Sequence, residues 1–164
     1  MEARERHHLI RLPLNDANIL VWKEITAFQI ASLGSACELG SRGTVPTSVT
    51  IRPCNGEPCT VTKGTLIAVT ISFMATANVT PGGALIRGTS AGAINRLPMR
   101  HNGVCGRVVP PCPIQTGETY NYYYTGQVPQ SVRTGPMTIR WELLNFNGVA
   151  FLCVEFPVII AEGS

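Results

Sequence analysis

The chain has 164 residues, of which 45% are hydrophobic and only 14% are charged, and its formal net charge is +3. This composition excludes a disordered chain, a coiled coil and a highly charged helical protein, and so small a net charge predicts no nucleic-acid partner. With 16 Gly and 12 Pro, the sequence is typical of a β-rich domain punctuated by turns, and no apolar run approaches the roughly 18 residues of a membrane span.

Residues 1–30 differ from the rest and predict a separate, atypical N-terminal segment. They hold four of the ten acidic residues, four of the thirteen basic residues and two of the three histidines. Residues 15–31 fit a helix, although a strand or disorder fits nearly as well. The longest aliphatic and aromatic run, 19–22, is too short for the apolar part of a secretory signal. We therefore expect a displaced signal or a mis-assigned start here.

The first predicted strands lie beyond residue 37. Residues 65–75 alternate strictly, which predicts a half-buried strand with a period of two. Its predicted inward face is formed by Ile67, Val69, Ile71 and Phe73. Residues 47–52 alternate in the same way, and Gly64 and the segment 78–83 supply turn residues at either end of the longer strand.

Four more strands are predicted in the second half of the chain. Residues 84–91 are a short candidate, 119–125 are rich in tyrosine, and 137–143 alternate again. A long apolar run, 150–160, follows a hairpin turn at 145–148. Six or seven strands separated by turns, without a clear long helix, predict an antiparallel β-sandwich.

The ionisable residues argue against an enzyme. From residue 31 onward there is no Asp, a single histidine, His101, and six scattered Glu. Acid–base catalysis requires ionisable groups within hydrogen-bond reach, and a nucleophile requires an activating base. We therefore expect no catalytic residues and no cofactor, with His101 as a solvated loop residue.

Six cysteines predict a disulfide framework. Six cysteines permit 15 pairings, so the sequence leaves the connectivity open. The most economical pairing is Cys54–Cys59, Cys105–Cys112 and Cys37–Cys153. A zinc site is the rival, but the six-residue spacing in the second pair departs from zinc knuckles, so no metal is expected. Disulfides imply an oxidising compartment, whereas the alternative is a cytosolic protein with six free thiols.

Three segments in combination resemble the ML lipid-recognition family, which includes Niemann-Pick type C2-like proteins and group 2 mite allergens. These segments are VTIRPCNGEPCTVTKGT (49–65), CGRVVPPCPIQTGETYNY (105–122) and WELLNFNGVAFLCVEFPV (141–158). The resemblance covers roughly residues 45–160 and also implies the disulfide pairing given above. It departs after Cys37, where Glu-Leu precedes the Gly-Ser that usually follows directly.

The resemblance implies that residues 31–164 form an all-β, immunoglobulin-like sandwich of seven or eight antiparallel strands with an apolar cavity between its sheets. It implies a monomeric carrier, secreted or in the lysosomal lumen, that holds a sterol, fatty acid or similar lipid. Transient contact with a membrane or receptor is expected. Sterol-binding members place an aromatic residue before a proline at the pocket mouth, where this chain has Leu97-Pro98.

The predicted pocket residues come from the inward faces of several strands and from the mouth. They are Val69, Ile71, Phe73, Ile86, Leu97, Pro98, Tyr122, Tyr124, Val128, Ile139, Trp141 and Val154. Each also fits ordinary sandwich core. The alternating Tyr120, Tyr122 and Tyr124 present three rings on one face, which suits either a portal or strand packing.

Two further surface features have possible roles. Asn78 begins the sole Asn-x-Ser/Thr sequence, in a predicted turn, and is a candidate glycosylation site. Arg96, Arg100, His101 and Arg107 form a modest basic cluster that is either a solvated loop or a docking site for an anionic membrane or ligand group.

Two alternatives to a carrier remain open. The first is an innate-immune recognition module that acts through a protein receptor, which exposed apolar residues at 97–99 would favour. The second is a structural sandwich with a solid core, which would lack a lipid-sized cavity.

Overall fold

The computed structural model describes residues 8–10, 21–23 and 43–163. Within these ranges, no helix is long and apolar enough to cross a membrane. Strands β1 (His8–Ile10) and β2 (Val21–Lys23) form a small antiparallel pair. Residues 21–23 therefore form a strand, which is one of the alternatives that the sequence leaves open for residues 15–31. The rest of that segment lies outside the described residues.

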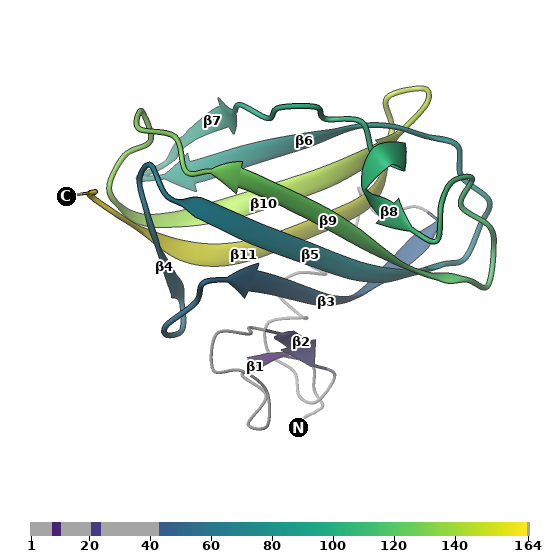
Figure 1. Cartoon of the computed structure of the whole chain (residues 1–164), viewed down its shortest axis with the longest axis horizontal. Coiled ribbons are helices and arrows are strands. Elements are labelled where there is room, and N and C mark those ends of the chain that lie inside the picture. Colours follow the sequence, from purple (N-terminus) through teal and green to yellow (C-terminus); the bar gives the residue numbers. More distant parts are fainter. Residues whose placement is uncertain (1–7, 11–20, 24–42, 164) are drawn as a thin grey trace.

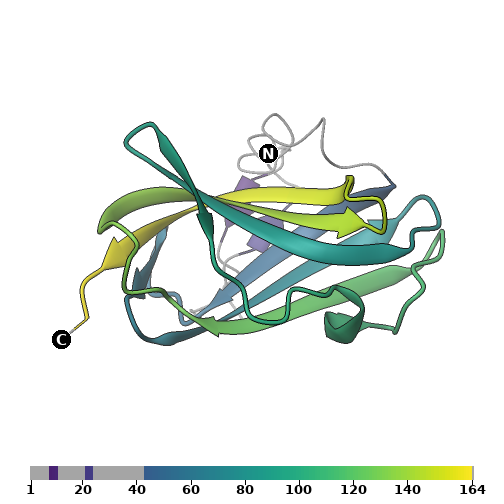
Figure 2. The same ribbon diagram turned by 90° about the horizontal axis from the view of Figure 1, so that it is seen from above.

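Two sheets packed face to face form the sandwich (Figure 1). The first sheet has the order β4-β11-β10-β6-β7. Its strands are β4 (Cys59–Thr62), β6 (Pro81–Ser90), β7 (Ala93–Leu97), β10 (Gly135–Asn145) and β11 (Ala150–Ala161). The second sheet has the order β3-β5-β9-β8. Its strands are β3 (Thr44–Arg52), β5 (Leu66–Ala75), β8 (Val108–Val109) and β9 (Thr119–Gln127). Figure 2 shows the two layers from above.

The all-β sandwich predicted from the sequence is confirmed, with two differences in detail. The two sheets of the described chain contain nine strands rather than seven or eight, because the short β4, β7 and β8 add to the six long strands located in the sequence. One pairing is parallel, between β4 and β11. The β10–β11 hairpin turns at Asn145, whose side-chain oxygen accepts hydrogen bonds from the backbone N–H groups of Asn147 and Val149.

A long connection, residues 98–118, runs from β7 in the first sheet to β9 in the second. It contains a 3-10 turn, η1 (Cys105–Arg107), followed by β8. Backbone hydrogen bonds hold it to the strand β6: Ala84 donates to Asn102, and Val104 donates to Gly82. This connection places Arg107 against the side chains of β9.

The interior of the sandwich is filled unevenly along the strands. One half holds packed aromatic rings: Phe73 stacks on Tyr120 with centroids 5.6 Å apart, and it meets Phe151 edge to face with centroids 6.2 Å apart. Phe73 is completely buried, and so is Leu143 in the same core. The other half, near the β9–β10 loop, is lined mostly by aliphatic side chains and contains free volume.

Candidate functional site

A cavity of about 80 Å³ lies between the two sheets in the aliphatic half of the sandwich. Strands of both sheets and the loop after β9 supply its walls, so the fold itself positions every lining side chain. The lining residues are Ile51, Val61, Ile67, Val69, Ile86, Leu97, Pro98, Tyr124, Gly126, Gln127, Val128, Pro129, Val132, Met137, Ile139, Trp141, Phe156, Val158 and Ile160. None of them is charged, so the cavity is suited to an apolar guest.

Eight of the twelve residues predicted for the pocket line this cavity. They are Val69, Ile86, Leu97, Pro98, Tyr124, Val128, Ile139 and Trp141. The other four, Ile71, Phe73, Tyr122 and Val154, lie in the closed part of the core instead. Their side chains have the predicted inward direction but stand further along their strands, where the aromatic residues fill the interior.

Sequence reasoning missed the final strand's contribution. Phe156, Val158 and Ile160 all line the cavity, as does Met137 on the neighbouring strand β10. The signal was present, because these residues of β11 share a face with Val154 in the period of two. Alternation identifies the face of a strand, whereas the position of the cavity along the strand depends on which partner side chains leave space.

The mouth lies where lining residues reach the surface, between the end of β7 and the loop after β9. Pro98 and Gln127 are exposed, and Leu97 and Pro129 are half-buried. Leu97 and the nearby Met99 pack against the core rather than standing free. The rim is therefore mainly apolar.

Tyr124 is held from several directions at the cavity wall. Its ring meets the Trp141 ring edge to face, with centroids 5.3 Å apart, and the Arg107 guanidinium carbon lies 4.8 Å from its centroid. Arg107 is fixed in turn by hydrogen bonds from its Nε to the His101 carbonyl and from its Nη2 to the Arg100 carbonyl. The basic residue of η1 thus stabilises an aromatic cavity wall through a cation–π contact.

Tyr122 lies one step deeper along β9 than Tyr124 and is completely buried. Its ring contacts Trp141 edge to face, with centroids 6.1 Å apart. Among the described residues, the Tyr122 hydroxyl and the Trp141 indole nitrogen have no partner of full hydrogen-bond geometry, and a looser polar contact joins the two side chains. Burial raises the pKa of Tyr122 to about 12, although the nearby Trp141 indole and Arg107 charge lower it in part. The hydroxyl therefore stays protonated at neutral pH.

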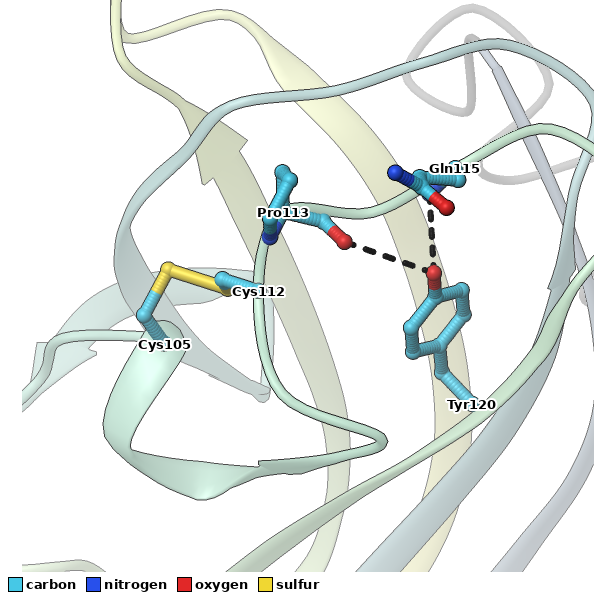
Figure 3. The surroundings of a disulfide bond; sticks show 5 residues. All are labelled: Cys105, Cys112, Pro113, Gln115 and Tyr120. Carbon is cyan, nitrogen blue, oxygen red and sulfur yellow. Dashed lines mark hydrogen bonds between the residues drawn. A yellow bond between two sulfur atoms is a disulfide. The ribbon is translucent and has the colours of Figure 1, made fainter.

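The two local disulfides are present as predicted, Cys54–Cys59 and Cys105–Cys112. Beside the second, the Tyr120 hydroxyl accepts a hydrogen bond from the Gln115 backbone N–H at 2.8 Å and donates to the Pro113 carbonyl at 3.4 Å (Figure 3). Cys153 is also disulfide-bonded, and its predicted partner, Cys37, lies outside the described residues.

The remaining predicted features lie on the surface. His101 is exposed in the loop before η1, as expected, and Arg96 and Arg100 of the basic cluster are exposed as well. Asn78 is exposed, and its side-chain oxygen accepts hydrogen bonds from the backbone and hydroxyl of Thr116, while glycosylation there stays a prediction. Within the described ranges, no three His, Cys, Asp or Glu side chains are grouped so that they could hold a metal ion.

Comparison with known proteins identifies relatives over most of the chain. NPC intracellular cholesterol transporter 2 of Mus musculus is 27% identical over 146 residues, which are 89% of this chain and 97% of the mouse protein. The zebrafish protein of the same name, from Danio rerio, is 27% identical over 114 residues, or 70% of this chain and 76% of the relative.

A solved structure shares the fold. A Niemann-Pick type C2 protein from the Japanese carpenter ant superposes with a TM-score of 0.64 at 23% identity, covering 74% of this chain and 95% of the ant chain. A family model described as the ML domain matches residues 33–160. That match spans most of the chain and includes both sheets of the sandwich, so the chain belongs to the ML domain family.

Proposed function

We propose that the protein binds a sterol, a fatty acid or a similar lipid in the cavity between its sheets and carries it between membranes or through extracellular fluid. The uncharged, apolar lining of the cavity carries this proposal. Such a site offers a lipid about 25 cal/mol for each Å² of apolar surface removed from water, without any bond being made or broken. The curated relatives named as cholesterol transporters support the same class of ligand.

The proposal requires the cavity to enlarge when a guest enters. Its volume of about 80 Å³ lies below the roughly 300 Å³ at which pockets for small organic ligands begin. The opposing walls belong to different sheets, and side-chain contacts rather than backbone hydrogen bonds join them across the interior. A guest can therefore push the two sheets apart at this end while the aromatic half keeps them together.

The packing of the apolar residues at the cavity mouth favours a carrier over a recognition module. A receptor-binding role calls for apolar residues displayed around residues 97–99. Leu97 and Met99 instead pack against the core, and only Pro98 of the three is exposed. Disulfides at Cys54–Cys59 and Cys105–Cys112 support an oxidising location, either outside the cell or in the lysosomal lumen.

Native mass spectrometry tests the proposal. Protein expressed through an oxidising secretory route is incubated with cholesterol or palmitic acid and sprayed under native conditions. We expect a one-to-one adduct with at least one of these lipids. Absence of an adduct with both would overturn the lipid-carrier proposal in favour of a solid-core sandwich.

A cavity-filling variant links the adduct to the cavity. Val69 is buried on β5 and lines the cavity, so Val69→Phe places a ring in the free volume. We expect the lipid adduct to be lost while the protein stays folded. Leu66→Phe is the matched control, because Leu66 lies on the same strand with 62% of its surface exposed. Equal adducts in both variants would show that the lipid binds elsewhere.

A further inference from the structure

A surface groove at the end of the sandwich away from the cavity mouth has no part in the proposed function. Its volume is about 490 Å³, and none of the described residues that line it is charged. Asn78 and Thr80 line it from the β5–β6 connection, and Phe146 and Asn147 line it from the β10–β11 hairpin. This hairpin and the β9–β10 loop lie at opposite ends of the strands (Figure 1). The groove thus contains both the sole Asn-x-Ser/Thr sequence of the chain and an aromatic side chain.

Hydrogen bonds determine which atom of the Asn78 amide faces outward. Thr116 donates to its side-chain oxygen twice, from the backbone N–H at 2.9 Å and from the hydroxyl at 3.1 Å. Because a backbone N–H can only donate, the atom that it meets is Oδ1 and not Nδ2. The side chain is exposed, and within the described ranges Nδ2 donates no hydrogen bond. A sugar attached to Nδ2 therefore leaves both contacts with Thr116 intact.

Phe146 supplies an exposed aromatic surface beside this asparagine. Its backbone N–H donates to the Thr80 carbonyl at 2.8 Å, so the hairpin is tied to the segment that holds Asn78. Its side chain is 78% exposed, more than any other large hydrophobic side chain in the described part of the chain. The C–H groups on one face of a pyranose ring suit the negative face of an aromatic ring. A sugar that begins at Asn78 therefore meets an aromatic surface in the same groove.

We propose that Asn78 carries an N-linked glycan and that the first sugar of this glycan packs on Phe146. In the transfer, Nδ2 bonds to the anomeric carbon of an oligosaccharide on a lipid pyrophosphate donor. The bond from that carbon to the pyrophosphate oxygen breaks, the lipid pyrophosphate leaves, and Nδ2 releases a proton. Pro81 directly after the sequence slows this transfer, so glycosylated and unmodified chains are expected together.

This inference is independent of lipid binding and rests only on the proposed oxidising location, because the donor is used in the secretory route. A glycan at this end covers the exposed Phe146 and stays away from the cavity mouth. The glycan and the lipid therefore occupy separate parts of the molecule, and each can be tested without the other.

Intact mass spectrometry tests the modification. The full chain is secreted from cultured mammalian cells behind a cleavable signal, and its mass is compared before and after digestion with N-glycosidase, which converts a glycosylated Asn to Asp. We expect a fraction with one oligosaccharide, mapped to Asn78, and none in Thr80→Ala. Thr116→Ala is the matched control, because Thr116 contacts Asn78 but lies outside the sequence that is recognised, and it should keep the glycan. A secreted, disulfide-bonded protein without any glycosylated fraction overturns the inference.

Thermal unfolding tests the contact with Phe146. Protein with high-mannose glycans is trimmed to the first sugar with an endoglycosidase or stripped completely with N-glycosidase. We expect trimming to leave the Tm unchanged and stripping to lower it by about 2–4 °C in the parent. Stripping should leave the Tm of Phe146→Ala unchanged. Val149→Ala is the matched control and should behave as the parent, because Val149 is 51% exposed in the same hairpin but does not line the groove.

The possible failures are distinguishable. An equal loss of Tm in the parent and in Phe146→Ala, or no loss in either, overturns the contact between the sugar and the ring. A protein that carries the glycan but forms no lipid adduct overturns the proposed function and leaves this inference in place.

Discussion

Tyr124 keeps its place in the cavity wall because the residue two positions later has no side chain. A Cβ atom at Gly126 would lie 2.8 Å from both Cε2 and the hydroxyl oxygen of Tyr124, closer than real contacts allow. We expect Gly126→Ala to displace the ring from Arg107 and Trp141 and to lower the free energy of unfolding by about 1–3 kcal/mol, as overpacking does. Urea denaturation measures this change.

A glycine in open space provides the comparison for that substitution. A Cβ atom at Gly106, in the turn that carries Arg107, would meet nothing within 4 Å. Gly106→Ala should therefore change the free energy of unfolding by less than about 0.5 kcal/mol. Equal changes in the free energy of unfolding for Gly126→Ala and Gly106→Ala would contradict the close contact between Gly126 and the Tyr124 ring.

The buried Tyr122 makes the free energy of unfolding depend on pH in the alkaline range. The folded protein keeps this proton until about pH 12, whereas an unfolded chain releases it near pH 10. Between these values the unfolded state binds fewer protons, so the free energy of unfolding falls as the pH rises, by about 1.4 kcal/mol per pH unit from this group. Below about pH 10 the group has no such effect.

Urea denaturation across that window measures the dependence on Tyr122. We expect the free energy of unfolding to fall less steeply with pH in Tyr122→Phe than in the parent, by about 1.4 kcal/mol per pH unit. The exposed Tyr123 supplies the control, since Tyr123→Phe should leave the decline unchanged. Identical slopes in all three proteins would contradict the assignment of a raised pKa to Tyr122.

At the scale of the elements, an ion-pair ladder crosses the outer face of the first sheet. Glu142 on β10 is buried and accepts Arg87 Nη1 on β6 at 2.9 Å and Arg140 Nη2 at 3.3 Å. Arg140 also meets Glu155 on β11 at 3.7 Å. The ladder therefore joins three strands by side chains in addition to the backbone hydrogen bonds.

Substituting the central carboxylate should weaken this sheet. We expect Glu142→Gln to lower the free energy of unfolding by about 1–3 kcal/mol, because charge-assisted hydrogen bonds to two arginines are lost. Glu155→Gln serves for comparison and should cost under about 1 kcal/mol, since its contact with Arg140, the one found within the described ranges, is longer and more exposed. Equal effects in denaturant titrations at low salt would contradict the central role of Glu142.

The sequence predicts the long strands better than the short ones for a physical reason. Strands β5 and β10 each have one face against the core, so burial imposes the period of two that the sequence displays. Strand β7 has four of its five residues exposed, so burial constrains only Leu97 and imposes no visible period on the sequence. Strand β4 has four residues and begins at the cysteine of a disulfide, too short for a period to be visible.

The candidate site was predictable only in part for a related reason. The inward direction of side chains such as Ile71 and Phe73 followed from alternation, and both are buried. Their distance from the cavity depends on contacts between the sheets, which join residues far apart in the sequence. The complete burial of Tyr122 against Trp141 could not be predicted either, because that contact joins residues of different sheets.

At the scale of the whole molecule, guest binding and folding stability are coupled. A guest that binds only the folded state stabilises it by about 2.7 kcal/mol when its free concentration is a hundred times Kd. We expect cholesterol or palmitic acid, whichever forms the adduct, to raise the urea midpoint of the parent protein. Val69→Phe, whose ring occupies the cavity, should show no such gain, and an equal gain in both would place the binding outside the cavity.

The uneven filling of the sandwich bears on how such a protein diversifies. Truncating a ring such as Phe73 in the closed half should cost about 3–5 kcal/mol, a large part of what holds a domain folded. Exchanges among aliphatic side chains beside free volume, such as Val69 or Ile139, typically cost less than about 1.5 kcal/mol. Descendants of this chain can thus vary the shape of the cavity and the guests it admits, while selection for folding acts mainly on the aromatic half.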